Sequence, residues 1–154
     1  MQTNLTNPNI FFMREALEQA KLAYRLREVP VGAVIVLDNE IISRGFNMRE
    51  TAHNALKHAE ITAIEKACEK LHTWRLWNCS LYVTMEPCPM CAGAIINARI
   101  PKVVFGAYDY KNGCCGSVIN LFEQPFTHKP DYEGGILQQE CGNLLSDFFK
   151  ELRK

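Results

Sequence analysis

The sequence predicts an α/β fold in which a mixed sheet carries helices on both faces. Helical and strand-like patterns follow one another in the order helix, hairpin, helix, strand, helix, strand, loop and helix. The length of 154 residues suits one domain. The composition, 47% hydrophobic and 22% charged, is that of a globular protein with a sizeable core. We therefore expect a single domain over residues 1–154.

A helix, a hairpin and a second helix are expected in the first half of the chain. Pro8 can begin a helix, and Pro30 should end it near Glu28, because a residue before proline disfavours helical geometry. The apolar run 31–37 and the segment 40–46 are typical of two strands joined by a tight turn. Apolar residues recur at helical spacing again over 58–71.

Two strands and two helices are expected in the second half. Residues 81–85 and 102–107 are strand-like, and the helix expected over 88–99 is bounded by prolines on both sides. The segment 108–135 is rich in Gly, Pro, Asn and Asp, which predicts a loop with room for one short strand. The last helix is marked by the apolar residues Leu144, Leu145, Phe148, Phe149 and Leu152.

Charge, hydropathy and cysteine count exclude several classes of protein. Seventeen Lys and Arg balance seventeen Asp and Glu, unlike a general nucleic-acid coat protein, although a local basic face remains open. We expect no membrane span, because no 18 consecutive residues are apolar, and no secretory signal in MQTNLTNPNIFF. The expected compartment is the cytoplasm, where seven cysteines serve metal binding or burial rather than a disulfide framework.

Two fragments carry residues typical of a metal site, His58-Ala59-Glu60 and Pro87-Cys88-Pro89-Met90-Cys91, and each opens an expected helix. Cys88 and Cys91 are three positions apart, so their sulfurs lie on one face of the first turn. A helix N-terminus lowers thiol pKa values, which favours the thiolates that bind metal. Zinc takes thiolate and imidazole readily, so His58 and the two cysteines are candidate ligands for one Zn²⁺.

This site is expected to be open, because catalytic zinc keeps a position for water whereas structural zinc is closed by four protein ligands. The candidates for a fourth ligand have no usual spacing from the first three; they are His53, His72, His128, Cys114 and Cys115. Glu60, two residues after His58, could take a proton from water that zinc activates. Taken alone, Glu60 would be an acid that complements the helix dipole.

The two fragments, separated by about thirty residues, resemble the signature of the zinc-dependent nucleoside and nucleobase deaminases. Further stretches resemble the bacterial tRNA adenosine deaminases within that superfamily; they are 27–34, 81–88, 90–95, 103–107 and 144–149. The resemblance covers most of the chain. It implies a three-layer α/β/α cytidine-deaminase-like fold, with a central mixed sheet of about five strands. It also implies a homodimer that converts adenosine to inosine at the wobble position of a tRNA anticodon.

The resemblance further implies roles for single residues. One zinc ion per subunit is expected on the three candidate ligands, with Glu60 as the proton shuttle. The expected substrate-binding residues are Asn47, Ala59, Val31, Asp109 and Phe149. Asn47 should hydrogen-bond the purine, and Asp109 should contact the RNA backbone near the target base. On the residues alone, Asn47 could also be a turn residue and Asp109 a solvated loop acid.

Two segments depart from the usual sequence of that family. Residues 53–57, before the HAE fragment, lack the proline and small residues that the family more often has there, which leaves the shape of one pocket wall open. Cys114 and Cys115 stand where small residues are common. We expect them to be buried or loop thiols rather than a second metal site.

A loop base suits such a site, because it can be splayed out at low cost whereas an adenine inside a stacked helix is out of reach. An anticodon stem-loop meets this demand. A neutral chain must then gather positive charge locally; candidates are Lys150, Arg153, Lys154, Arg25, Arg27, Lys57 and Lys111. Phe148 and Phe149 cannot share one helix face, so one is expected in the core, and the other on a base or in a dimer interface.

Two other functions fit parts of the sequence. A free guanine, cytosine or cytidine deaminase of the same superfamily would have identical metal chemistry, although the small cytidine deaminases typically use three cysteines where this chain has His58. A non-catalytic, zinc-stabilised RNA-binding module would need a fourth protein ligand and would leave Glu60 without a purpose. The matches outside the metal site favour the tRNA enzyme.

Overall fold

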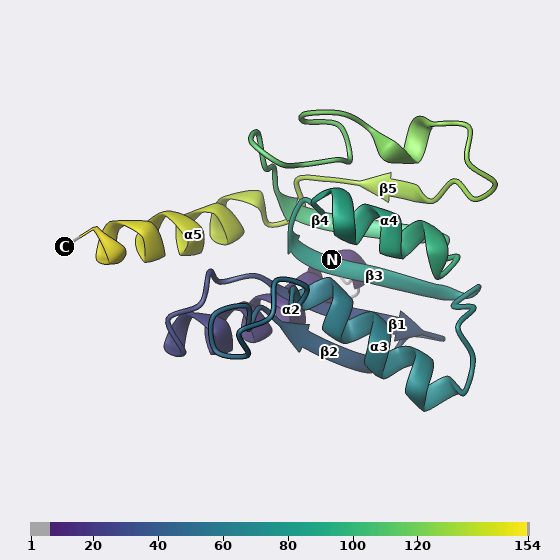
Figure 1. Cartoon of the computed structure of the whole chain (residues 1–154), viewed down its shortest axis with the longest axis horizontal. Coiled ribbons are helices and arrows are strands. Elements are labelled where there is room, and N and C mark those ends of the chain that lie inside the picture. Colours follow the sequence, from purple (N-terminus) through teal and green to yellow (C-terminus); the bar gives the residue numbers. More distant parts are fainter. Residues whose placement is uncertain (1–6, 154) are drawn as a thin grey trace.

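The computed structural model of the chain describes residues 7–153 (Figure 1). Residues 1–6, on which the expectation about an export signal partly rests, and the candidate basic residue Lys154 lie outside the described residues. Within 7–153, no helix combines the length and the hydropathy needed to cross a bilayer. The elements in chain order are α2 (Pro8–Arg25), β1 (Gly32–Leu37), β2 (Glu40–Phe46), α3 (Ala59–Leu71), β3 (Cys79–Met85), α4 (Pro89–Asn97), β4 (Lys102–Ala107), the 3₁₀ helix η1 (Leu121–Glu123), β5 (Asp131–Glu133) and α5 (Gln138–Leu152).

The five strands form one mixed sheet in the order β2-β1-β3-β4-β5. β1 runs antiparallel to β2 and β3, whereas β3, β4 and β5 run parallel to one another. A parallel pair needs a crossover, and α4 supplies it between β3 and β4. β5 is the one short strand that was expected within the loop segment 108–135. The expected five-stranded mixed sheet is confirmed.

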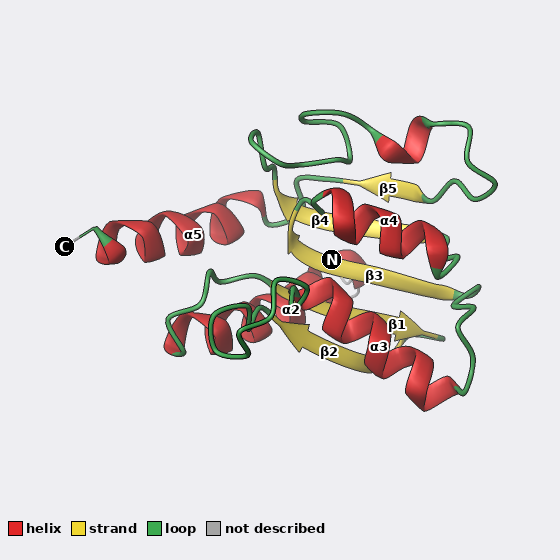
Figure 2. Ribbon diagram, viewed as in Figure 1, coloured by secondary structure: helices red, strands yellow, loops and turns green. Residues whose placement is uncertain are grey.

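Helices cover both faces of this sheet, because alternate side chains of its central strands point to opposite sides. Ile35 and Val83 pack in one cluster with buried residues of α3 and α4. Val34, Tyr82 and Val104 pack in a second cluster with residues of α2 and α5. Figure 2 shows α3 and α4 in front of the sheet and α2 behind it. The three-layer α/β/α arrangement that was expected is therefore confirmed.

The first helix ends at Arg25, earlier than the expected end near Glu28. Arg27 adopts a left-handed conformation with φ 61°. Its amide donates to the Tyr24 carbonyl at 3.0 Å, and the Glu28 amide donates to the Ala23 carbonyl at 2.9 Å. This pair of bonds is a Schellman motif, which ends the helix before Pro30 can do so. The turn places Glu28 where it contacts the loop that follows β2.

One edge of the sheet collects the features that build the site. The carboxyl ends of β2, β3 and β4 lie there beside the start of β1, since Gly32 pairs with Phe46 and Met85 with Ala107. A Cβ on Gly45 would lie 2.4 Å from the Ala59 carbonyl oxygen, so this glycine lets the first turn of α3 pack directly on β2. Ligands of open α/β sheets bind beyond the carboxyl ends of strands.

Candidate metal and substrate site

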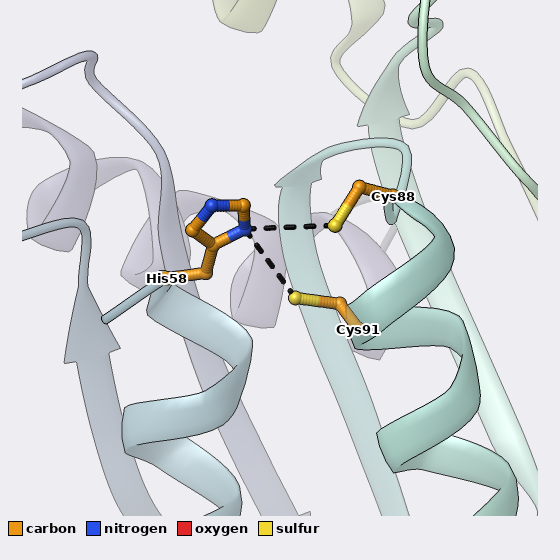
Figure 3. Close-up of side chains that lie close together, drawn as sticks. All are labelled: His58, Cys88 and Cys91. Atoms are coloured by element: carbon orange, nitrogen blue, oxygen red, sulfur yellow. Dashed lines mark hydrogen bonds between the residues drawn. The ribbon is translucent and has the colours of Figure 1, made fainter. Parts of the chain in front are cut away.

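His58, Cys88 and Cys91 meet where α3 and α4 begin. His58 is the N-cap residue of α3, Cys88 is the N-cap residue of α4, and Cys91 lies in the first turn of α4. Their metal-binding atoms all lie within 4.8 Å of one another. Nδ1 of His58 is 3.6 Å from each cysteine sulfur, and all three side chains point toward one another (Figure 3). The structure thus brings together the three residues that the spacing predicted.

The geometry of the three side chains fits a tetrahedral zinc ion. Zn–S bonds of about 2.3 Å and a Zn–N bond of about 2.0–2.1 Å, at a tetrahedral angle, would separate the nitrogen from each sulfur by about 3.6 Å. Both observed nitrogen–sulfur distances are 3.6 Å. The ligand types also fit zinc, which binds thiolate sulfur and imidazole nitrogen readily, whereas magnesium prefers oxygen ligands. These residues can therefore hold a zinc ion without rearrangement.

The pKa values of the two cysteine thiols are shifted in opposite directions. A hydrogen bond with Cys91, and then one with His58, lower the pKa of the Cys88 thiol to about 4, although burial opposes this shift. The hydrogen bond with Cys88, together with burial, raises the pKa of the Cys91 thiol. The pair accordingly consists of a thiolate and a thiol. A divalent cation would displace the remaining proton, since thiolates are the species that bind metal.

The cluster has three protein ligands within residues 7–153, and none of the candidates for a fourth joins it. His72 caps the opposite end of α3. Nε2 of His128 lies 2.7 Å from the Ile100 carbonyl oxygen, so this ring is hydrogen-bonded outside the cluster. Cys114 and Cys115 are buried, as expected of small packed thiols. A metal here would keep one coordination position for a ligand that the described residues do not provide.

Glu60 lies on the first turn of α3 and is only 4% exposed. Burial raises the pKa of its carboxyl group to about 7. A carboxyl group with a pKa near neutrality can both accept and release a proton at physiological pH, which general acid–base catalysis requires. Glu60 also lines the same cavity as His58 and Cys88. It is thus placed for proton transfer beside the metal-binding cluster.

A cavity of about 640 Å³ opens beside this cluster, a volume that suits a nucleoside-sized ligand. Its walls include His58, Glu60 and Cys88. They also include every residue expected from the sequence to bind substrate; these are Val31, Asn47, Ala59, Asp109 and Phe149. Residues far apart in the chain therefore converge on one concave site.

Asn47 is 8% exposed, and its side chain is held by backbone groups of neighbouring segments. Its side-chain amide donates to the Val29 carbonyl at 3.2 Å, and its side-chain oxygen accepts from the Arg49 amide at 3.2 Å. The second contact is the turn geometry considered as an alternative from the sequence. One N–H of the amide group has no partner in these two contacts, so Asn47 can be a turn residue and also offer a donor to the cavity.

Asp109 organises the loop that follows β4. Its side-chain oxygen accepts hydrogen bonds from the backbone amides of Lys111 and Asn112, both at 3.1 Å. This differs from a freely solvated acid, because the carboxylate fixes the turn in which it sits. Arg49 and Lys111 line the same cavity and are the basic residues of its wall. Lys111 was among the basic candidates, whereas Arg49 was not.

Phe148 and Phe149 divide as expected from their adjacent positions on α5. Phe148 is 6% exposed and packs edge-on against Tyr24, with ring centroids 5.6 Å apart. Phe149 is 39% exposed and lines the cavity. The core position of one phenylalanine is confirmed, and the other ring is available to a ligand.

Two buried glutamates that the sequence analysis did not single out fix the loops around the cavity. Glu86, directly after β3, accepts hydrogen bonds from the amides of Asp109, Cys115 and Ser117 at 2.9–3.0 Å, and from the Ser117 hydroxyl at 2.5 Å. It is 2% exposed and also lines the cavity. The sequence did contain a signal for Glu86: an acidic residue between a buried strand and the PCxxC fragment is expected to be buried, and a buried carboxylate needs hydrogen-bond partners.

Glu28 performs the same task for the loop after β2. It is 1% exposed and accepts hydrogen bonds from the Glu50 amide at 3.1 Å and from the amide and hydroxyl of Thr51 at 2.5 Å. Burial would raise the pKa of Glu28, but the hydrogen bonds from Thr51 and Glu50 outweigh it and hold the pKa below its usual 4.5. Both loops that border the cavity are therefore tied to buried carboxylates.

Comparison with known proteins points to one kind of enzyme. The MafB19-like deaminase family matches residues 8–153. The tRNA-specific adenosine deaminase of Bacillus subtilis (strain 168) is 52% identical over 144 residues, which are 93% of this chain and 89% of that protein. The likeness therefore extends across nearly all of both chains.

Solved structures agree with this relationship. A structure from a study of A-to-I editing by tRNA:A34 deaminases at the wobble position of transfer RNA is 43% identical, with a TM-score of 0.85, and the alignment covers 87% of this chain and 98% of that one. The guanine deaminase from Bacillus subtilis is less similar, at 32% identity and a TM-score of 0.61, with 76% of this chain and 85% of that one covered.

Proposed function

The chain belongs to the family of tRNA-specific adenosine deaminases, and from that premise we propose that it converts adenosine to inosine at the wobble position, position 34, of a tRNA anticodon loop. One observation carries the proposal: the metal-binding cluster and Glu60 share a single cavity with all five residues expected to bind the substrate. Chemistry and recognition are thus available in one place.

The cofactor we propose is one Zn²⁺ per subunit, held by His58, Cys88 and Cys91. The matching nitrogen–sulfur distances of 3.6 Å and the soft donor set support this choice. When bound, zinc supplies the Lewis acidity that lowers the pKa of a coordinated water to about 7. The positive ends of the α3 and α4 dipoles stabilise the two thiolates at the same point.

Glu60 then acts as the proton carrier of the reaction. Its carboxylate accepts a proton from the attacking water and delivers it to N1 of adenine, which makes C6 more electrophilic. The water oxygen adds to C6. Glu60 next carries the proton of the new C6 hydroxyl group to the exocyclic amine, the C6–N bond breaks as the C6 oxygen becomes a carbonyl, and ammonia leaves, so that inosine remains. The pKa of about 7 suits a group that must gain and lose a proton twice.

The remaining residues of the cavity hold the adenosine and its neighbours. Asn47 offers its unpartnered amide N–H to the purine, while Val31 and Ala59 provide apolar walls. Asp109, on the loop after β4, contacts the RNA backbone near the target base, and Phe149 offers an exposed ring for stacking. A base reaches this cavity only when it is unstacked, which an anticodon loop permits.

We further propose that the chain forms one domain and assembles as a homodimer in the cytoplasm. The resemblance to the family supports the dimer, and a tRNA substrate supports the compartment. Sedimentation velocity is expected to give twice the 17.5 kDa mass of one chain. A single species at the mass of one chain would contradict the dimer and leave the chemistry of the cavity unaffected.

The substrate is tested directly by offering the purified protein three compounds side by side. These are an anticodon stem-loop with adenosine at the wobble position, free guanine, and cytidine. We expect inosine and ammonia from the stem-loop only. Release of ammonia from guanine or cytidine alone would replace the tRNA assignment by that of a free nucleobase or nucleoside deaminase. Inosine sequencing of total tRNA then identifies which tRNAs are edited.

A further inference from the structure

Two tyrosines at the mouth of the cavity take no part in the chemistry described above. Tyr108 and Tyr110 both line the cavity. Their rings lie nearly parallel, with centroids 6.3 Å apart and an interplanar angle of 19°. Tyr108 is 36% exposed and Tyr110 is 76% exposed, so Tyr110 is the outer member of the stack. A large aromatic side chain so exposed beside a ligand cavity is available to a partner.

The inner ring of this stack is firmly held. Tyr108 packs edge-on against the buried Phe105, with centroids 5.2 Å apart and planes at 89°. The backbone between the two tyrosines is fixed as well, because the Asp109 amide donates to Glu86 and the Asp109 carboxylate accepts from the Lys111 amide. The tyrosine stack is thus preorganised, and a ligand that adds to it loses little entropy in ordering the protein.

The polar surroundings of the stack favour a nucleic acid as its partner. Asp109, Lys111 and Asn112 are exposed or half-buried next to the two rings and line the same cavity. A protein interface would need a well-packed patch of about 800 Å² on each partner, with few charges at its centre. A single-stranded nucleic acid needs only an aromatic face for a base and a cation near its phosphates.

We propose that Tyr110, supported by Tyr108, is the stacking platform for an unpaired base that neighbours the target adenosine in the anticodon loop. This assignment rests on the proposed function. With the adenosine inside the cavity, the next base along the strand emerges at its mouth, where Tyr110 presents its outer face. Lys111, the following residue, is exposed, lines the same cavity and provides a cation for the phosphate that links the two nucleotides. Tyr110 is therefore a substrate-positioning residue.

The test compares Tyr110→Ala and Tyr110→Phe on an anticodon stem-loop with adenosine at the wobble position. Base–aromatic stacking predicts that Tyr110→Ala raises KM by about 5- to 100-fold and leaves kcat closer to the wild-type value. Tyr110→Phe keeps the ring and should stay within about twofold of wild type. A loss in both variants would point to the hydroxyl group and overturn the stacking role.

Abasic stem-loops provide the decisive arm. The base on the 5′ side, or the one on the 3′ side, of the adenosine is removed. On one of these two substrates the wild-type protein and Tyr110→Ala should have the same KM, because the stacking partner is gone. If the effect of Tyr110→Ala persists undiminished on both, the platform does not exist. An altered sedimentation mass for Tyr110→Ala would instead identify a contact between copies of the chain, which also overturns the proposal.

Trp77→Ala is the matched control. Trp77 is an exposed aromatic residue too, at 55%, but it lies just before the first residue of β3, about 20 Å along the strand from the end that borders the cavity. It should behave as wild type on every substrate. The two proposals fail separately: a wild-type protein that forms no inosine in the intact stem-loop overturns the proposed function itself. Inosine formation with equal KM for wild type and Tyr110→Ala overturns only the platform.

Discussion

In the proposed reaction, Glu60 connects the metal-binding residues to the substrate. It follows His58 by two positions, so the backbone that presents the imidazole also fixes the carboxylate in the same cavity. Burial accounts for its raised pKa, and that burial is possible because the first turn of α3 packs directly on β2 beside Gly45. One helix terminus therefore places both the proposed metal ligand and the proposed proton carrier.

Glu60→Gln is expected to lower the rate of inosine formation by about 10²- to 10⁴-fold, because an amide cannot transfer the proton. Zinc content, measured on the same preparation, should equal that of wild type. Glu65→Gln is the matched control, since Glu65 lies on the same helix but is exposed and paired with Lys57. Activity near wild type in Glu60→Gln would refute the role, and loss of zinc would identify Glu60 as a ligand.

Glu28 gives the stability of the protein a defined pH dependence. Its pKa in the folded protein lies below the usual 4.5, so folding favours the ionised carboxylate. This contribution to the free energy of unfolding is complete above about pH 4.5 and is lost as the pH falls through the folded-state pKa. Glu28→Gln should thus destabilise the protein by about 1–3 kcal/mol at pH 7 and by less at pH 3.

Urea unfolding at both pH values measures this effect. Glu50→Gln is the control, because Glu50 contributes its backbone amide rather than its side chain to the contact with Glu28. An equal loss at pH 7 and pH 3 for Glu28→Gln would mean that the ionised form of Glu28 carries no special stability.

At the scale of single residues, the metal ligands could be predicted because residue type and spacing both constrain them. Helix geometry places the sulfurs of Cys88 and Cys91 on one turn, and the resemblance to the deaminase signature adds His58 from the preceding helix. Glu28 and Glu86 could not be predicted in the same way. Their partners are backbone amides and hydroxyl groups of distant loops. The position of Glu86 after a strand indicates a buried carboxylate, but the sequence does not identify the groups that bind it.

At the scale of elements, the helices and strands followed from apolar periodicity. The bounds of β2 and β4 agree with the expected ranges 40–46 and 102–107. The end of α2 did not, because a left-handed residue at Arg27 closed the helix before the proline was reached. An arginine gives little warning of this conformation, which glycine adopts more readily. The strand order also lay beyond periodicity, since it depends on contacts between distant segments.

The loop from Tyr108 to Ser117 depends on Glu86, and Glu86→Ala should loosen it. The amides of Cys115 and Ser117 would lose a buried charged acceptor, which lowers the free energy of local opening by about 1–3 kcal/mol. Amide hydrogen exchange should accelerate at these two residues. Glu28→Ala is the reciprocal control, because it should accelerate exchange at Thr51 and leave Ser117 unchanged. Unchanged exchange at Ser117 in Glu86→Ala would contradict the account.

At the scale of the whole molecule, the metal-binding cluster draws its residues from two helices, α3 and α4. α3 follows β2 and α4 follows β3 on the same face of the sheet (Figure 1). The cluster lies between the first turns of these two helices. A ligand that binds only the folded protein stabilises all of it. The zinc ion should therefore raise the stability of the complete three-layer fold.

Chelation of zinc is expected to lower Tm by about 5–10 °C. This is the stabilisation that a domain of this size gains from a ligand whose free concentration is about 100 times its Kd. Differential scanning calorimetry with and without chelator measures the shift. His58→Ala should have a lower Tm that no longer responds to chelator. A wild-type Tm that is insensitive to chelator would show that the cluster does not hold an ion in the folded protein.

X-ray absorption at the zinc edge of the freshly purified protein tests the central claim most directly. Three protein ligands and an open position predict two sulfurs at about 2.3 Å and two lighter ligands at about 2.0–2.1 Å. One light ligand is the His58 imidazole and the other comes from solvent. Three or four sulfurs, or a second imidazole, would mean that the chain closes the site itself and would contradict the enzymatic account.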